Sequence, residues 1–101
     1  MTPLPSASSS DDLESRLFLA EAGAELPEAD LHGLRWDQAR EQAERLIQGA
    51  YVHRERVVRI IHGKGEGKLR DALHGWLRAH PLVEGFRESA VGGETAVALR
   101  N

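Results

Sequence analysis

The apolar positions of this chain follow a helical period in two segments. In the first segment they lie on one helix face, at Ala39, Ala43, Leu46, Ile47 and Ala50. Asp37 lies near the start of this segment, where a carboxylate suits the helix dipole. The second segment has the same spacing at Leu69, Ala72, Leu73, Trp76 and Leu77, and Pro81 ends it after His80. The pattern predicts two amphipathic helices.

The segments around these helices are typical of strands. Residues 57–61 are rich in β-branched side chains, which suits a strand that is covered on both faces. Residues 29–32 form a short segment before Gly33, and residues 83–89 and 95–99 flank a glycine pair as in a hairpin. The order strand–helix–strand–helix–strand–strand predicts a two-layer α/β sandwich with a mixed four-stranded sheet. Its first two strands should be parallel, with a right-handed crossover.

The N-terminal part has a different composition. The first twelve residues are rich in Pro and Ser and then acidic, and residues 13–24 hold a few apolar side chains that suit a short helix or an added strand. We expect residues 1–28 to be a disordered or weakly ordered linker and residues 29–101 to be the folded domain. An initial Met followed by a linker suggests the C-terminal piece of a longer protein.

Composition excludes several classes of protein. The 101 residues include no cysteine, which excludes disulfides, a thiolate nucleophile and cysteine-ligated zinc. The absence of cysteine also fits a cytoplasmic protein. No apolar run approaches the roughly 20 residues of a membrane-spanning helix, and the N-terminus has no secretory pattern.

Charge is distributed unevenly along the chain. The net charge is −3, but residues 1–28 hold six acids and one base. Residues 53–70 hold six bases and two acids, which is the main basic concentration of the sequence. A local positive surface is what a nucleic-acid partner needs, although a solvated strand edge would have the same composition.

The first candidate for chemistry is the segment Ala29-Asp30-Leu31-His32-Gly33. Residues two apart on a strand point to the same side, so Asp30 and His32 should share a face. A carboxylate beside an imidazole can orient the ring and raise its basicity, as in a general base. The alternative is a turn-capping aspartate beside a solvated histidine.

The second candidate is the glycine-rich loop that follows the central strand and opens the second helix. Its glycines allow backbone N–H groups to approach an anion, and the helix N-terminus favours negative charge. It has neither a Walker pattern nor a dinucleotide-binding pattern. The alternative is a flexible turn between strand and helix. The predicted phosphate-contacting residues are His62, Gly63, Lys64, Gly65, Gly67, Lys68, Arg35 and Thr95, with Arg70 beside them.

Other polar and aromatic side chains are weaker candidates. Three histidines suit surface roles, at positions 53, 74 and 80. Trp36 suits either stacking on a base or covering a helix end, whereas Trp76 falls on the apolar stripe of its helix. Asp30, Glu66 and Glu94 could meet at a metal ion, but their spacing does not require one, and we assign no metal ligand.

Three motifs of this sequence together resemble the Smr (small MutS-related) domain family. Ala29-Asp30-Leu31-His32-Gly33 matches the opening Leu-Asp-Leu-His-Gly signature except at its first position. The segment from His62 to Arg70 matches the His-Gly-Lys-Gly-x-Gly-x-Leu-Arg motif in full. The closing glycine turn, threonine and strand resemble residues 92–99. The resemblance covers residues 29 to 100, and Ala29 and the acidic Glu66 are the departures.

The resemblance implies a fold like the C-terminal domain of bacterial translation initiation factor three. It also implies nucleic-acid binding and endonuclease activity. In the MutS-paralogue setting the family is linked to nicking of branched or duplex DNA and to suppression of recombination, while other members cleave RNA or act on stalled ribosomes. The implied catalytic residues are Asp30, His32 and Arg70.

The resulting hypothesis is an endonuclease domain that nicks branched or duplex DNA and is tethered to a larger, dimerising ATPase. His32, oriented by Asp30, would move a proton while Arg70 stabilises charge on the phosphate. RNA would supply its own nucleophile, whereas DNA would call for an activated water and Mg²⁺ or Mn²⁺. The alternatives are an RNA endonuclease or ribosome-associated domain, a binding module without catalysis, and a protein-interaction domain.

Overall fold

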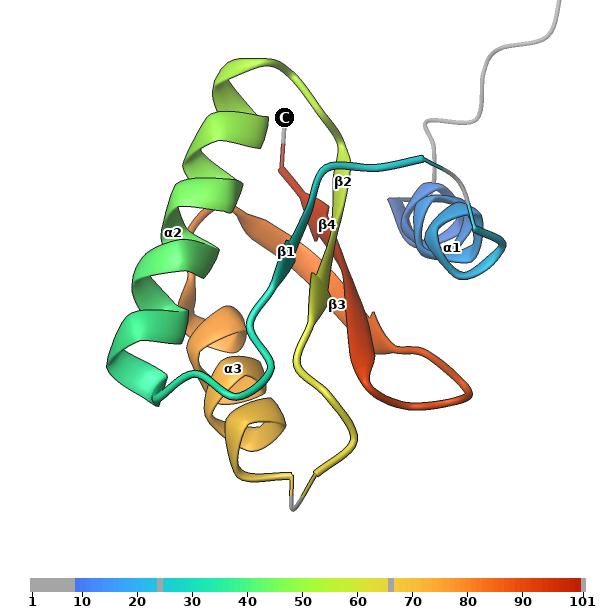
Figure 1. The fold of residues 1–101 in the computed structure, drawn as a ribbon. Helices are drawn as coiled ribbons and strands as arrows, with labels where there is room; N and C mark the ends of the chain where they lie inside the picture. Colours follow the sequence, from blue (N-terminus) through green and yellow to red (C-terminus); the bar gives the residue numbers. More distant parts are fainter. Residues whose placement is uncertain (1–8, 24, 66, 101) are drawn as a thin grey trace, which may run out of the picture.

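The fold is that of a computed structural model, which describes residues 9–23, 25–65 and 67–100 (Figure 1). Strands and helices follow one another in the predicted order after one additional helix at the N-terminus. The elements are α1 (Ser9–Glu21), β1 (Glu28–Asp30), α2 (Trp36–Val52), β2 (Val57–Ile61), α3 (Lys68–Ala79), β3 (Val83–Glu88) and β4 (Glu94–Leu99).

The four strands form one mixed sheet in the order β1-β2-β4-β3. β1 pairs with β2 in parallel, and β4 pairs with β2 and β3 in antiparallel. The predicted mixed sheet and the parallel first pair are confirmed. Because β1 and β2 run in the same direction and are neighbours, the loops that follow them leave from the same edge of the sheet.

The main core lies between the sheet and the helices α2 and α3, which cover one of its faces (Figure 1). Small side chains let α2 lie close to the sheet: Ala39 and Ala43 are fully buried beside Ile47. From the sheet, β2 contributes Val58 and Ile60 to this core. The predicted helix faces are therefore the buried faces.

The N-terminal segment differs from the expected linker, because residues 9–21 form α1 on the other face of the sheet (Figure 1). Leu17 and Ala20 of α1 are buried against Val57 and Ala98. This second layer explains why both faces of β2 are apolar. A short helix was one of the two options considered for residues 13–24, but its docking on the sheet was not predicted, because the segment has few apolar residues. The first eight residues lie outside the described part of the chain.

Charged contacts across the sequence hold α1 in place. The guanidinium of Arg16 is buried and donates to the carbonyl oxygen of Leu99 at 3.0 Å and to the carboxylate of Glu84. Arg87 on β3 pairs with Glu21 at 3.1 Å and with Glu14. Hydrogen bonds from a buried guanidinium offset the cost of removing its charge from water.

Arg59 on β2 links the sheet to α1 and to the short strand β1. Its guanidinium donates to the carbonyl of Ala20 at 2.9 Å and pairs with Glu28 at 3.1 Å and Glu94 at 3.4 Å. β1 has only three residues, so this ion pair supports a strand with few backbone hydrogen bonds. In the described part of the chain, no helix has the length and apolarity to cross a membrane.

Replacing Leu17 with Ala tests whether α1 folds together with the domain. We expect L17A to lower the free energy of unfolding by about 2 to 4 kcal/mol, because a buried side chain leaves a cavity. The control is L19A on the same helix, where the side chain is 54% exposed and the change should stay within about 0.5 kcal/mol. Equal urea midpoints for L17A and the unsubstituted chain would contradict a docked α1.

Candidate functional site

The loops after β1 and β2 line one open groove of about 440 Å³. The first loop supplies His32, Gly33 and Leu34, and the second loop and the first turn of α3 supply residues 62–65 and 67–70. The two loops are close together, since a Cβ built on Gly63 would lie 3.1 Å from the Cβ of His32. The two predicted candidates therefore form one site.

Asp30 and His32 form the predicted pair on this edge. Asp30 Oδ1 accepts hydrogen bonds from the backbone N–H of His32 at 3.1 Å and from its ring Nδ1 at 2.7 Å. The hydrogen bond with the imidazole, followed by the backbone bond, lowers the pKa of Asp30 below its usual value. With Nδ1 bound to the carboxylate, Nε2 is the ring nitrogen left for proton transfer, and the side chain is 69% exposed.

The glycine loop is shaped by two left-handed residues and held by the β3–β4 turn. Gly63 and Gly67 have φ values of 84° and 86°, which favour glycine over any L side chain. The backbone N–H groups of His62 and Gly63 both donate to the carbonyl of Gly93 at 2.9 Å. Gly67 precedes the first turn of α3, so the groove opens onto a helix N-terminus, where an anion is favoured.

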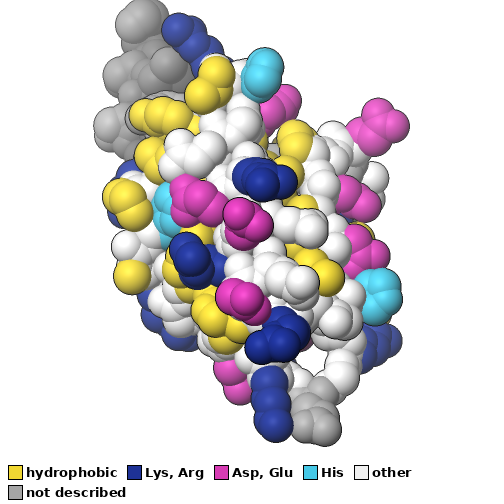
Figure 2. All heavy atoms as spheres, turned by 60° about the vertical axis from the view of Figure 1, so that its left-hand side comes forward, with side chains coloured by type: hydrophobic (Ala, Val, Ile, Leu, Met, Phe, Trp, Pro, Cys, Tyr) yellow, Lys and Arg dark blue, Asp and Glu magenta, His cyan; other side chains and the backbone are white. Residues whose placement is uncertain are grey.

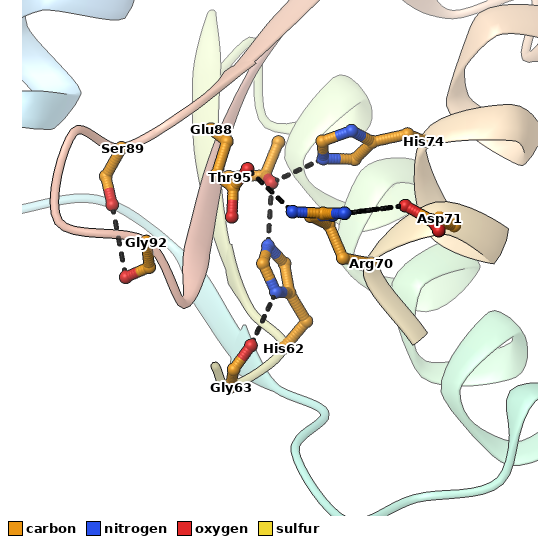
Figure 3. A network of polar contacts seen from close by, with 9 residues as sticks. All are labelled: His62, Gly63, Arg70, Asp71, His74, Glu88, Ser89, Gly92 and Thr95. Carbon is orange, nitrogen blue, oxygen red and sulfur yellow. Dashed lines mark hydrogen bonds and ion pairs between the residues drawn. The ribbon is translucent and has the colours of Figure 1, made fainter. Parts of the chain in front are cut away.

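Arg70 reaches the groove, but its guanidinium is already in ion pairs. It binds Asp71 at 3.0 Å and Glu88 on β3 at 3.4 Å (Figure 3). The hydrogen bond to Asp71 and the nearby negative charges raise the pKa of Arg70. Glu88 could not be predicted from sequence spacing, because only the folded sheet brings β3 beside the start of α3.

His62 and Thr95, predicted to contact phosphate, are instead buried together (Figure 3). His62 donates from Nδ1 to the carbonyl of Gly63 at 3.1 Å, which leaves Nε2 to accept the Thr95 hydroxyl at 2.9 Å. The same hydroxyl oxygen then accepts from Nε2 of His74 at 2.8 Å. These side chains support the glycine-rich loop from the interior of the domain. Because His62 and Thr95 are buried, their predicted direct contact with phosphate is not supported.

Of the three histidines predicted to lie on the surface, two are buried or partly buried and one is exposed. His74 belongs to the buried network and is half-buried, and burial lowers its pKa. His80 is buried, binds Glu44 at 3.0 Å and accepts the backbone N–H of Leu82. Their distant partners, Thr95 and Glu44, explain why local spacing did not find them. His53 stays on the surface, where it binds the carbonyl of Gly49 at the end of α2.

The tryptophans lie between the helices. Trp36 and Trp76 pack edge to face with ring centroids 6.1 Å apart, and both pack against the main core. This agrees with the predicted core position of Trp76. For Trp36 it favours the covering role over stacking on a base.

The other basic side chains predicted to contact phosphate are exposed on the surface. Lys64 and Lys68 are exposed on the groove wall together with Gly65. Arg35 is 86% exposed at the start of α2 and lies 3.9 Å from Asp37. Figure 2 shows acidic and basic side chains intermingled over most of the visible face, so that face has no continuous basic surface.

Among the described residues, the groove contains no cluster of side chains that could ligate a metal ion. In 9–23, 25–65 and 67–100, no three His, Asp or Glu side chains are grouped so that they could hold a metal ion. Asp30 is bound to His32, and Glu94 is 3.4 Å from Arg59. Glu66, the third acid considered from the sequence, lies outside the described residues.

Fold and groove together define a small α/β domain whose two parallel strands end beside a glycine-rich loop and a helix N-terminus. A family model described as the Smr domain matches residues 29–100. This chain belongs to the Smr domain family. The match begins at β1, so α1 lies outside it.

Relatives and solved structures agree with this assignment. The chain is 41% identical over 76 residues to the protein named endonuclease MutS2 of Caldicellulosiruptor saccharolyticus, covering 71% of this chain and 10% of that protein. It therefore spans about a tenth of the length of the curated relatives it matches. The Smr domain of Thermus thermophilus MutS2 is similar with a TM-score of 0.72 and 34% identity, over 75% of this chain and all of that one. YdaL, a stand-alone small MutS-related protein from Escherichia coli, has a TM-score of 0.72 and 26% identity, over 87% and 76%.

Replacing glycines in the loop tests its geometry. Gly63→Ala would place a Cβ 3.1 Å from His32 in a left-handed backbone, so we expect a loss of about 1 to 3 kcal/mol of unfolding free energy. At Gly65 a Cβ meets open space, and G65A should change stability by less than about 0.5 kcal/mol. Chemical denaturation compares the two, and equal losses would contradict the described packing.

The buried histidine network predicts a loss of stability in acid. The folded state lowers the pKa of His74 below its usual 6.5, so the unfolded chain takes up a proton first as the pH falls. We expect the free energy of unfolding to fall as the pH drops below 6.5, and to fall less in H74Q. Urea titrations between pH 7.5 and 5.5 measure this, and the same slope in H74Q would contradict it.

Proposed function

We propose that this chain is a nucleic-acid endonuclease domain that cleaves phosphodiester bonds in the groove between its two loops. The observation that carries the proposal is the meeting of an oriented histidine and a glycine-rich helix N-terminus in one groove. The first group can move a proton, and the second favours a phosphate. The name endonuclease MutS2, carried by relatives that match this chain, supports the same class of reaction.

In the proposed reaction, the loop amides and the two exposed lysines hold the phosphate. Nε2 of His32 accepts a proton from the attacking oxygen while Asp30 holds the ring by its Nδ1 hydrogen bond. The attacking oxygen forms a bond to phosphorus, and the leaving oxygen departs with the electrons of the broken bond. The positive charge that develops on the imidazole is stabilised by the carboxylate of Asp30.

Arg70 would stabilise negative charge on the phosphate oxygens. Its ion pairs with Asp71 and Glu88 hold the guanidinium at the groove but also compete with the phosphate. A charge-assisted, two-pronged contact with phosphate can replace such exposed pairs, because surface ion pairs contribute about 0 to 1 kcal/mol. Arg70 is therefore proposed to exchange partners when the substrate arrives.

Two observations favour different substrate classes. The resemblance of the sequence favours branched or duplex DNA, in the suppression of recombination. The oriented histidine favours RNA, because the 2′-hydroxyl of RNA is a built-in nucleophile next to the phosphate and His32 can accept its proton. We propose phosphodiester cleavage as the shared activity, with substrate and added metal as variables of the test.

A second candidate function is a binding module without catalysis. It is favoured by Arg70, whose guanidinium is neutralised by two carboxylates in this structure. Such a module would use the same groove and lysines to dock a larger protein onto nucleic acid. The length of the relatives supports a tethered setting for either function, and we propose a larger MutS-type ATPase as the carrier.

Replacing His32 with Ala separates the two candidates. We expect H32A to lower the cleavage rate by about 10²- to 10⁴-fold, the usual contribution of a positioned general base, while binding changes little. End-labelled RNA and DNA of the same sequence are incubated with EDTA, Mg²⁺ or Mn²⁺, and products and gel shifts are recorded.

The matched control is H53A, which removes an exposed histidine at the far end of α2 and should cleave normally. Cleavage by H32A at the rate of the unsubstituted chain would exclude His32 as the base. Retained gel shifts with no cleavage by any variant would favour the binding module.

A further inference from the structure

The basic run at residues 53–70 is divided by the fold, and the groove described above uses only one half of it. Lys64, Lys68 and Arg70 follow β2, whereas Arg54 and Arg56 precede it. A strand of five residues separates the two halves, so they lie at opposite edges of the sheet. The groove described above therefore does not account for the arginines that precede β2.

A second groove, of about 560 Å³, lies at that opposite edge. Its walls come from the end of α2, the loop between α2 and β2, and the residue after β4, near the chain end marked in Figure 1. Six residues line it: Tyr51, Val52, Arg54, Glu55, Arg56 and Arg100. We call it the distal groove. Only the tertiary structure brings Arg100 to the other two arginines.

Three arginines and one glutamate give the distal groove a positive balance. Arg56 is partly neutralised, because it pairs with Asp12 of α1 at 3.2 Å. Arg54 and Arg100 are exposed and have no ion pair with a carboxylate of the described residues. Two guanidiniums are thus left to bind an anion.

The distal groove also exposes flat and apolar surface. Tyr51 is 40% exposed and Val52 is 72% exposed, although neither belongs to a core cluster. A tyrosine ring beside arginines is the combination that holds a base by stacking and its phosphate by charge. A nucleotide of a single strand has both parts.

The backbone at Arg54 gives an independent indication. α2 ends with hydrogen bonds from the N–H of Glu55 to the carbonyl of Ala50 and from the N–H of Arg54 to that of Tyr51. This is the Schellman arrangement, whose left-handed residue is usually glycine. Here that residue is Arg54, with a φ of 62°, and among the described residues it is the one non-glycine with positive φ. Arg54 therefore places a cation at a position where the backbone favours glycine.

We propose that the distal groove is a second subsite for the nucleic-acid strand, which binds phosphate through Arg54 and Arg100 and stacks a base on Tyr51. The proposal rests on the proposed function, which supplies the strand. The two grooves lie at the two ends of α2, whose 17 residues span about 25 Å. At about 3.4 Å per stacked nucleotide, roughly seven nucleotides join the two subsites.

The test uses Arg54→Gly together with Arg100→Gln in the full chain. R54G removes the cation and relieves the left-handed strain, so the melting temperature should stay equal or rise while binding weakens. For a fluorescent 20-nucleotide strand, we expect roughly tenfold weaker binding in the double variant, and a salt dependence reduced by about 1.4 in slope. A four-nucleotide strand is too short to join the grooves, so its contacts in one groove do not add to those in the other, and the double variant should weaken its binding less than that of the 20-nucleotide strand.

The matched control is R40Q with R45Q, which removes the same charge from the exposed face of α2 and should change binding far less. Equal losses in the control and the distal variant, or no loss in either, would overturn the distal subsite. K64A tests the first groove separately. If K64A weakens binding and the distal variant does not, the distal subsite fails alone. If no strand binds to the unsubstituted chain, the proposed function fails with it.

Discussion

The site depends on the parallel pairing of β1 with β2. This pairing brings the ends of the two strands to one edge, where Asp30 lies opposite Ile61 in the register. The Asp30–His32 pair and the glycine loop then share one groove, although about 30 residues of chain separate them. β1 itself is short, and Arg59 supports it through Glu28. The ion pair between Arg59 and Glu28 therefore helps to position the Asp30–His32 pair.

A buried polar network gives the glycine loop its shape. His62, Thr95 and His74 satisfy one another's hydrogen bonds beneath the loop, and the β3–β4 turn accepts two of its N–H groups. Such a network specifies one geometry because each unpaired buried polar group would cost about 1 to 3 kcal/mol. The network and these two backbone hydrogen bonds therefore hold the start of the loop in one conformation.

Charge has three different uses in this chain. Arg16, Arg59 and Arg87 form hydrogen bonds and ion pairs that join α1 to the sheet. The lysines of the glycine loop face solvent at one edge of the sheet, and Arg54 and Arg100 face solvent at the other. The net charge of −3 says little about binding, since residues 1–28 have a net charge of −5 and the rest of the chain has a net charge of +2. A strand bound to both grooves would meet positive charge at each end of α2.

Local patterns in the sequence are enough to predict the order of the elements, the buried helix faces, the mixed sheet and the glycine-rich loop before α3. Periodicity and turn chemistry are local properties, so neighbouring residues are enough to encode them. Local patterns do not predict that His62 and Thr95 are buried, that Arg70 pairs with Glu88, or that α1 packs on the second face of the sheet. Each of these depends on partners that are distant in sequence and become neighbours only when the sheet has formed.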